Sequence, residues 1–257
     1  MKIYKFLPSP ILSSFIKEFT IIESEREADS MLIPDTSMAM AFRFRGKVLN
    51  TGTGTSEVIP DNVVSGLRRS PRFFRYEAST SNLIVVFKEA GFASFTKIPA
   101  HELFGESIAS ENVFLAIELT EISERLAIAK SHVDRIVIVE NFLLRKLIPS
   151  NPDHLVAHAI QIMNNERGIV RMKDLAASLH LSQDPFEKRF RTLIGCSPKH
   201  YASVIRLKNL IKNYSPTISL TQASYDAGYF DQSHFIKDFR QFTGRSPKAF
   251  FASARYW

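Results

Sequence analysis

The sequence of 257 residues contains a single cysteine, Cys196, so it can form neither an internal disulfide nor a metal site of several thiolates. It also lacks an uninterrupted run of about 20 apolar residues, the length that a membrane-spanning helix needs. Its first residues, MKIYKFLPSP, carry no apolar run like the one that follows the basic start of a signal peptide. These absences predict a cytoplasmic protein with no membrane segment.

Residue types that build metal and catalytic sites are scarce in the first part of the chain. Only two histidines, His101 and His132, precede residue 150, and they are far apart in the sequence. A sugar isomerase needs a cluster of ligands, and a DNA-repair alkyl acceptor needs a reactive thiolate before Cys196. We therefore expect no metal, no cofactor and no enzymatic activity. Cys196 is either a redox sensor or an inert thiol in a turn, and the lack of a resolving cysteine favours the second.

Charge is unevenly distributed along the chain. Residues 1–150 contain 18 Lys and Arg against 18 Asp and Glu, whereas residues 151–257 contain 15 against 8. The whole net charge of +7 therefore belongs to the second part. A basic segment attached to a neutral one is typical of a protein that binds a polyanion such as DNA.

The first hundred residues have the pattern of β structure. Residues 38–45, MAMAFRFR, alternate between large apolar residues and small or charged ones, and this period of two predicts a half-buried strand. One face of that strand would carry Met38, Met40, Phe42 and Phe44. Further strands are predicted at 19–23, 72–77 and 83–88. Short strands with frequent turns indicate a small barrel or sandwich.

Two helices are predicted over about 110–147. Ser110 is the expected N-cap of the first, and Ser131 with Asp134 forms a capping box for the second. The second helix has an apolar stripe, which serves either packing within the domain or a dimer surface: Ile136, Val139, Phe142 and Leu143. The proline-containing stretch 148–153 is the expected boundary. The predicted domains are a sensor or dimerisation domain at 1–148 and a second domain at 149–257.

A sequence block occurs twice in the second domain. Phe186–Lys199 and Phe235–Lys248 follow one template, Phe-x-Lys-x-Phe-Arg-x-x-x-Gly-x-Ser-Pro-Lys, with eight of 14 positions identical and a separation of 49 residues. Each block contains the second helix of a helix-turn-helix pattern. The two patterns lie at about 172–194 and 220–243, and a long helix at 198–212 joins them. The predicted fold is therefore α+β, with a β-rich first domain and an all-α second domain.

Each block divides into an apolar face and an outward face. We expect the apolar residues to anchor the helix in the core: Phe186, Phe190 and Leu193 in the first copy, and Phe235, Phe239 and Phe242 in the second. The outward face carries Lys and Arg at matched positions, where they suit guanine or phosphate: Lys188, Arg191, Lys237 and Arg240. The duplication of these cations favours DNA binding over a merely solvated helix face.

Residues 173–250 contain a set of short motifs: Leu175-Ala176, Arg206-Leu207, Gly228-Tyr229, the segment Asp231-Gln232-Ser233-His234-Phe235 and the two Gly-x-Ser-Pro segments. With these motifs the segment resembles the AraC/XylS-type DNA-binding domain. It implies a transcription regulator whose two recognition helices enter successive major-groove segments of double-stranded DNA. The base-reading positions that it implies are Asp184, Glu187 and Lys188 in the first copy, and Gln232, Ser233 and Lys237 in the second. It further implies RNA polymerase, a front-domain effector or protein partner, and a second copy of the chain as partners.

The two copies differ at the reading positions. Asp184 and Glu187 are acidic, and a carboxylate near phosphates is repelled unless it finds a donor such as cytosine N4. We therefore expect the second copy to be the stronger reader. The alternative is an interaction protein that has lost DNA affinity in its acidic first copy and antagonises a related regulator instead.

Overall fold

The computed structural model describes residues 1–52, 54, 56–149 and 152–252, and the chain divides into two compact units. The first unit consists of Met1–Leu32, Ser37–Gly66 and Arg72–Ser150. The second consists of Ile33–Thr36, Leu67–Pro71 and Asn151–Trp257. Residues 150 and 151, inside the predicted boundary at 148–153, lie outside the described residues, so the exact boundary stays a prediction.

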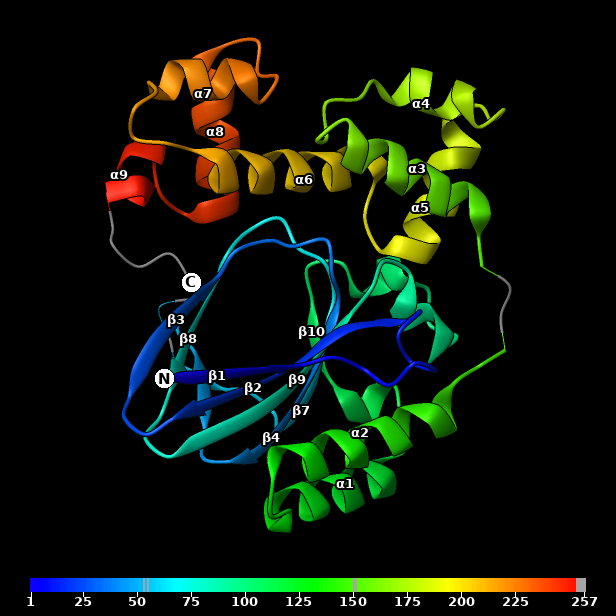
Figure 1. The fold of residues 1–257 in the computed structure, drawn as a ribbon, viewed down its shortest axis with the longest axis vertical. Helices are drawn as coiled ribbons and strands as arrows, with labels where there is room; N and C mark the ends of the chain where they lie inside the picture. Colours follow the sequence, from blue (N-terminus) through cyan, green and yellow to red (C-terminus); the bar gives the residue numbers. More distant parts are fainter. Residues whose placement is uncertain (53, 55, 150–151, 253–257) are drawn as a thin grey trace. The chain divides into compact units, whose positions relative to one another are not determined.

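The described part of the first unit contains two antiparallel sheets (Figure 1). In order, the six-stranded sheet has β1 (Lys2–Phe6), β2 (Ile16–Ser24), β9 (Thr80–Phe87), β4 (Ala39–Arg45), β7 (Asn62–Ser65) and β10 (Ser107–Ala109). The four-stranded sheet has β3 (Ala28–Leu32), β8 (Arg72–Tyr76), β5 (Val48–Asn50) and β6 (Glu57–Val58). The outer strands β1 and β10 are not paired with each other, so the arrangement is sandwich-like and not a closed barrel.

The predicted alternation in residues 38–45 holds only over part of β4. Met40 and Phe42 are fully buried as expected, but Arg43 is also buried and Phe44 is only half-buried. The register between β4 and β9 shifts between Arg43 and Arg45. This shift comes after Arg43, so it turns the later side chains and leaves Phe44 only half-buried. Arg43 itself stays on the face opposite Phe42, where its buried side chain is paired with Asp61. The prediction of an outward Arg43 is therefore wrong.

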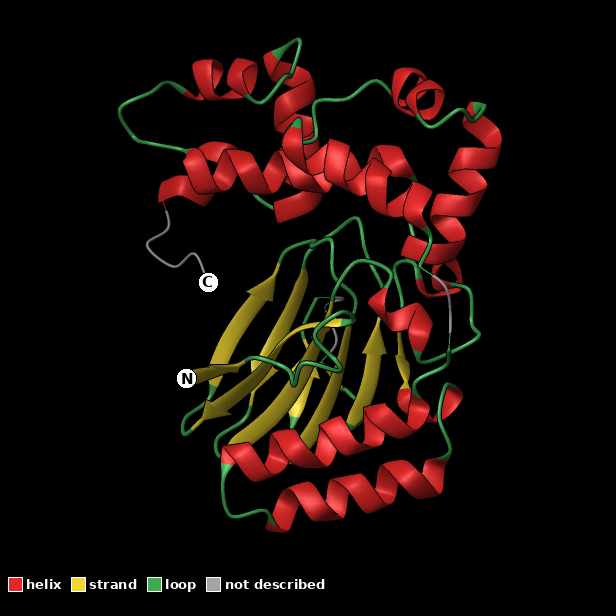
Figure 2. Ribbon diagram, turned by 45° about the vertical axis from the view of Figure 1, so that its right-hand side comes forward, coloured by secondary structure: helices red, strands yellow, loops and turns green. Residues whose placement is uncertain are grey.

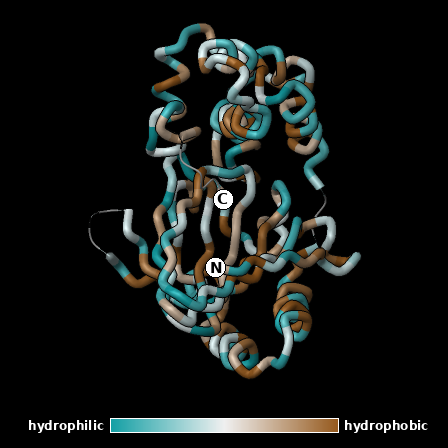
Figure 3. The backbone as a smooth tube through the Cα atoms, turned by 60° about the vertical axis from the view of Figure 1, so that its left-hand side comes forward, coloured by the Kyte–Doolittle hydropathy of each residue, from teal (hydrophilic) through white to brown (hydrophobic). Residues whose placement is uncertain are grey.

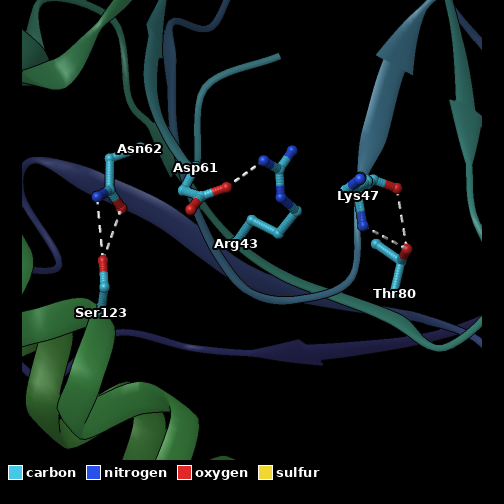
Figure 4. A network of polar contacts seen from close by, with 6 residues as sticks. All are labelled: Arg43, Lys47, Asp61, Asn62, Thr80 and Ser123. Carbon is cyan, nitrogen blue, oxygen red and sulfur yellow. Dashed lines mark hydrogen bonds and ion pairs between the residues drawn. The ribbon is translucent and has the colours of Figure 1, made fainter. Parts of the chain in front are cut away.

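Polar contacts tie the strands of the first unit to their neighbours (Figure 4). The buried guanidinium of Arg43 is paired with Asp61. Asn62 of β7 donates to Ser123 Oγ at 3.0 Å, which joins the six-stranded sheet to the following helix. Buried polar groups of this kind must find partners, because leaving them unpaired costs about 1–3 kcal/mol each. The Asn62–Ser123 hydrogen bond therefore holds the helix on the sheet.

Two helices, α1 (Ala116–Ile128) and α2 (His132–Lys146), lie against the six-stranded sheet (Figure 1). Ser110 does not cap α1, because it belongs to the short 3-10 helix η3 (Ser110–Asn112), and Leu115 is the N-cap. The capping box of Ser131 and Asp134 is confirmed. The α2 stripe is buried, with the Phe142 ring 6.2 Å from that of Phe42. This stripe therefore packs within its unit.

The second unit is helical in its described part apart from connecting segments (Figure 2). Its helices are α3 (His154–Asn165), α4 (Met172–Ser178), α5 (Gln183–Ile194), α6 (Pro198–Asn213), α7 (Leu220–Asp226), α8 (Gln232–Thr243) and α9 (Pro247–Ala252). The long α6 runs through the middle, with α3–α5 at one end and α7–α9 at the other (Figure 1). No helix in the described ranges is long and apolar enough to cross a membrane.

Local sequence explains how α6 begins and what packs on it. Ser197 caps the helix by accepting from the His200 N–H at 3.2 Å, and Pro198 occupies the first turn, where its missing N–H is not needed. Gly168, with φ of +79°, lies so close to α6 that a Cβ would be 2.2 Å from the Ala202 carbonyl oxygen. Only glycine fits there, so the turn after α3 is held against α6.

Candidate nucleic-acid interface

Both copies of the duplicated block form the second helix of a helix-turn-helix pair, α5 after α4 and α8 after α7. Their aromatic anchors are buried, and the rings of each pair lie edge to face at 5.8 Å for Phe186 and Phe190 and 5.6 Å for Phe235 and Phe239. Hydrophobic and hydrophilic residues alternate along the helical turns of the protein, as expected for helices with one apolar side (Figure 3). The anchors of the two copies therefore match.

The third anchor of the first copy differs from the prediction. Leu193 is half-buried, and Ile194 is 3% exposed instead. Ile194 follows Phe190 by four residues, so the buried stripe continues at that spacing. In the second copy the predicted anchor Phe242 is buried, together with Thr243 at the position that matches Ile194.

The ends of α5 and α8 are also alike. Gly195 follows α5 with φ of 100° and Gly244 follows α8 with φ of 69°, and both donate their N–H to the last turn of the helix. A residue with a side chain is strained in this left-handed conformation, which explains the glycine of the template. Repeated anchors and repeated caps give the two helices one scaffold.

The outward face of α5 carries both signs of charge. Asp184 is exposed in the first turn, where a carboxylate favours the positive end of the helix dipole. Glu187 lies 3.9 Å from Arg191 one turn later, so a predicted reading residue pairs with a predicted DNA-contacting cation of the same helix. Lys188 is exposed and has no ion pair among the residues described. The predicted α5 residues therefore have no net charge and include one internal pair.

The outward face of α8 carries positive charge only. The four predicted DNA-contacting residues are all exposed, and in the described part of the chain none has a side-chain hydrogen bond or ion pair: Gln232, Ser233, Lys237 and Arg240. Two lysine or arginine charges and two neutral groups give this set a net charge of +2. Asp231 caps the helix by accepting from the His234 N–H at 2.7 Å. The donors of α8 are therefore free to bind a ligand.

A polar cluster beneath α8 was not predicted. The Arg206 guanidinium of α6 lies 4.2 Å from the centre of the Tyr229 ring and 3.6 Å from the Asp238 carboxylate. Asp238 also lies 3.8 Å from His234. Burial raises the pKa of Tyr229 to about 12, so this phenol stays neutral. The cluster joins α8 to α6, and its only signal in the sequence was the pair of motifs that contain Arg206 and Tyr229.

An ion pair joins α5 to the start of α3. Arg189 Nε donates to the Asp153 carboxylate at 2.5 Å, and the same carboxylate caps α3. Burial raises the pKa of Asp153, but the hydrogen bond from Arg189 and the backbone N–H of Val156 lower it more, so the result lies below its ordinary value. Asp153 is therefore held as an anion.

The lone cysteine is buried. Burial raises the pKa of the Cys196 thiol to about 12, against smaller opposing effects of nearby arginines. The reactive form of cysteine is the thiolate, which this site disfavours at neutral pH. The structure therefore supports the inert alternative. Among the described residues there is also no group of three or more His, Cys, Asp or Glu that could hold a metal ion.

Two family models match the chain. Residues 175–253 match a helix-turn-helix domain, and residues 4–109 match a domain of unknown function (DUF6597). The first match covers both copies of the duplicated block. The second covers the strands of the first unit and indicates no ligand.

Curated relatives match part of the chain. The Msm operon regulatory protein of Streptococcus mutans is 29% identical over 143 residues, which is 53% of this chain and 51% of the relative. The lactose operon transcription activator of Staphylococcus xylosus is 30% identical over 86 residues, which is 33% of this chain and 31% of the relative. The chain thus spans about half the length of the first relative and less of the second. The first relative is named as a regulatory protein and the second as a transcription activator.

Among solved structures, ToxT from Vibrio cholerae aligns with 93% of this chain and 98% of its own, at 12% sequence identity and a TM-score of 0.47. A likeness at this level indicates neither a ligand nor a partner.

Proposed function

Because residues 175–253 carry a helix-turn-helix domain of the AraC/XylS type, we propose that the chain is a one-component, sequence-specific DNA-binding transcription regulator. Its two recognition helices, α5 and α8, would enter successive major-groove segments of one promoter site. Contacts to phosphates would supply affinity that depends on salt, and a few side chains in each helix would read bases.

The observation that carries this proposal is the duplicated scaffold with exposed first turns. Both helices bury aromatic residues on one side and present polar residues near their N-termini on the other. A recognition helix needs this division, because its N-terminal turns reach the base edges while its apolar side remains in the domain. The excess charge of +7 after residue 150 supports the same proposal.

The roles that we propose differ between the helices. In α8, Gln232 can pair with adenine, Ser233 with several bases, and Lys237 and Arg240 with guanine or phosphate. In α5, Glu187 can accept from cytosine N4, and Asp184, Lys188 and Arg191 complete the contacting set. Because Glu187 and Arg191 already pair, binding would have to break or reorient that pair.

Selection of bound duplexes from a random pool with the full chain tests the proposal. We expect one enriched motif with two conserved blocks whose centres are about 10 base pairs apart, one helical turn. The affinity of the selected duplex, measured by fluorescence anisotropy at several salt concentrations, should fall steeply with salt. A scrambled duplex of equal length and composition is the control.

Failure of the selection would favour the alternative function. Asp184 and Glu187 motivate an interaction protein, because carboxylates weaken attraction to phosphates. That protein would enrich no motif, and its affinity for DNA would be too low to give a measurable salt slope. An enriched motif with only one block would contradict the two-helix mode of reading while leaving DNA-binding regulation in place.

Partners other than DNA are separate proposals. The first unit matches a domain of unknown function, and its α2 stripe is used for internal packing. A homodimer would therefore need other residues than that stripe. The spacing and number of selected half-sites would report whether one copy or two bind the same duplex.

A further inference from the structure

The turn of the second helix-turn-helix unit is one residue longer than that of the first. In the first unit His180 and Leu181 separate the C-cap of α4 from Ser182, the N-cap of α5. In the second unit three residues separate the C-cap of α7 from the N-cap of α8: Gly228, Tyr229 and Phe230.

Backbone geometry identifies the added residue. The first residue of each turn is left-handed, with φ of 56° at His180 and 73° at Gly228. The next residue, Leu181 or Tyr229, donates its N–H to a carbonyl oxygen of the preceding helix at 3.0 Å. The two turns therefore match through Tyr229, and Phe230 has no counterpart in the first unit.

Phe230 lies in solvent between two anchored residues. Its side chain is 95% exposed, the highest value among the large apolar residues of the described chain. On one side Tyr229 is buried under Arg206, and on the other Asp231 caps α8. A phenyl ring presented between two anchored residues loses less conformational entropy when a partner covers it than one on a free chain.

The position of Phe230 indicates the chemistry of that partner. The residue comes directly before the cap of α8, two and three residues ahead of the exposed Gln232 and Ser233. The first turns of a recognition helix enter the major groove, where the apolar group on a base edge is the C5 methyl of thymine. Resting on the proposed function, we infer that Phe230 contacts a thymine methyl beside the bases that α8 reads, and so determines specificity in the second unit.

Replacement of thymine by deoxyuridine tests this contact, because it removes the methyl and keeps the base pair. Each thymine of the selected site would be replaced in turn, and affinities measured by anisotropy for the full-length wild type, Phe230→Ser and Phe230→Leu. Ile128→Ser is the control, since Ile128 is 81% exposed on α1 and lies outside the proposed interface. Circular dichroism confirms that each variant is folded.

We expect one thymine at the α8 end of the site whose replacement weakens wild-type binding about fourfold, the value of one buried methyl-sized group. Phe230→Ser should weaken binding to the thymine duplex by a similar factor and should no longer respond to deoxyuridine there. Phe230→Leu should retain most of the response, and Ile128→Ser all of it.

Three results would overturn the inference while leaving the proposed function intact. These are a selected motif with no thymine at the α8 end, a wild type that is indifferent to deoxyuridine, and a Phe230→Ser variant as sensitive as the wild type. A selection that enriches nothing would instead reject DNA reading itself, and the inference with it.

Discussion

The two helix-turn-helix units share a scaffold and differ in what they present to a ligand. Aromatic anchors and glycine caps repeat, whereas the outward charges are balanced in α5 and positive in α8. Burial explains the difference, because a change in the core costs stability and a change on an exposed face costs little. A duplicated scaffold can therefore keep its fold while its copies diverge in binding.

Substitution of the aromatic anchors should have the largest effects on stability, and these effects should be similar in the two copies. Phe190→Ala and Phe239→Ala each remove a fully buried ring, so each should lower the free energy of unfolding by about 3–5 kcal/mol. Chemical denaturation of the full chain measures the loss, with the exposed Ile128→Ala as control. A difference of more than about twofold between the two losses would contradict the equivalence of the scaffolds.

Substitution of the matched arginines should affect DNA binding differently in the two copies. Arg240 has no ion pair in the described residues, whereas Arg191 pairs with Glu187. Arg240→Ala should weaken DNA binding and reduce the slope of log affinity against log salt by about one, the effect of a lost phosphate contact. Arg191→Ala should change the slope less. Equal reductions would show that the Glu187 pair does not restrain Arg191.

The folding stability of the first copy should depend more on acidic pH than that of the second, because Arg189 of the first copy pairs with Asp153. The pKa of Asp153 is lowered in the folded state, because the hydrogen bonds from Arg189 and the α3 backbone outweigh burial, which acts in the opposite direction. Its contribution, about 1 kcal/mol for the cap, is therefore present above the unfolded pKa near 4 and lost as pH falls through the folded value. Asp153→Asn should flatten the dependence of unfolding free energy on pH below about pH 5. Arg189→Ala, which keeps the cap, should flatten it only in part.

The repeat and the helix signals in the second unit were readable from sequence because they depend on local chemistry. Serine caps, Pro198 and the template glycines act within one turn, so the helices lie where they were predicted to within a few residues. The choice of Ile194 over Leu193 was missed, since adjacent apolar residues both fit a helical stripe. Phe230 was missed because a match of the blocks at 49 residues hides a one-residue difference in the turns before them.

The first unit was harder to predict, because its strands pair residues that are far apart in sequence. Arg43 was expected outward and is buried, since its partner Asp61 is 18 residues away in the sequence and cannot be read from β4 alone. Six strands, β1, β3, β5, β6, β7 and β10, were not predicted individually. These strands depend on neighbours for their hydrogen bonds, whereas a helix makes its own.

Substitution of Cys196 should have the smallest effect on DNA binding. Because burial raises its pKa to about 12, its thiol should resist iodoacetamide at pH 8 in the folded chain and react after unfolding. Cys196→Ala should leave DNA affinity unchanged under oxidising and reducing conditions. Rapid alkylation of the folded chain, or affinity that depends on redox state, would restore the sensor alternative.

One comparison tests the unequal reading of DNA most directly. The affinities of the wild type, Gln232→Ala and Glu187→Ala would be measured by anisotropy on the same selected duplex at one salt concentration. Loss of a bidentate contact to adenine should weaken the Gln232→Ala variant by about fivefold or more, while Glu187→Ala, which removes a negative charge, should lose less. A larger loss for Glu187→Ala would contradict the account that the second copy is the stronger reader.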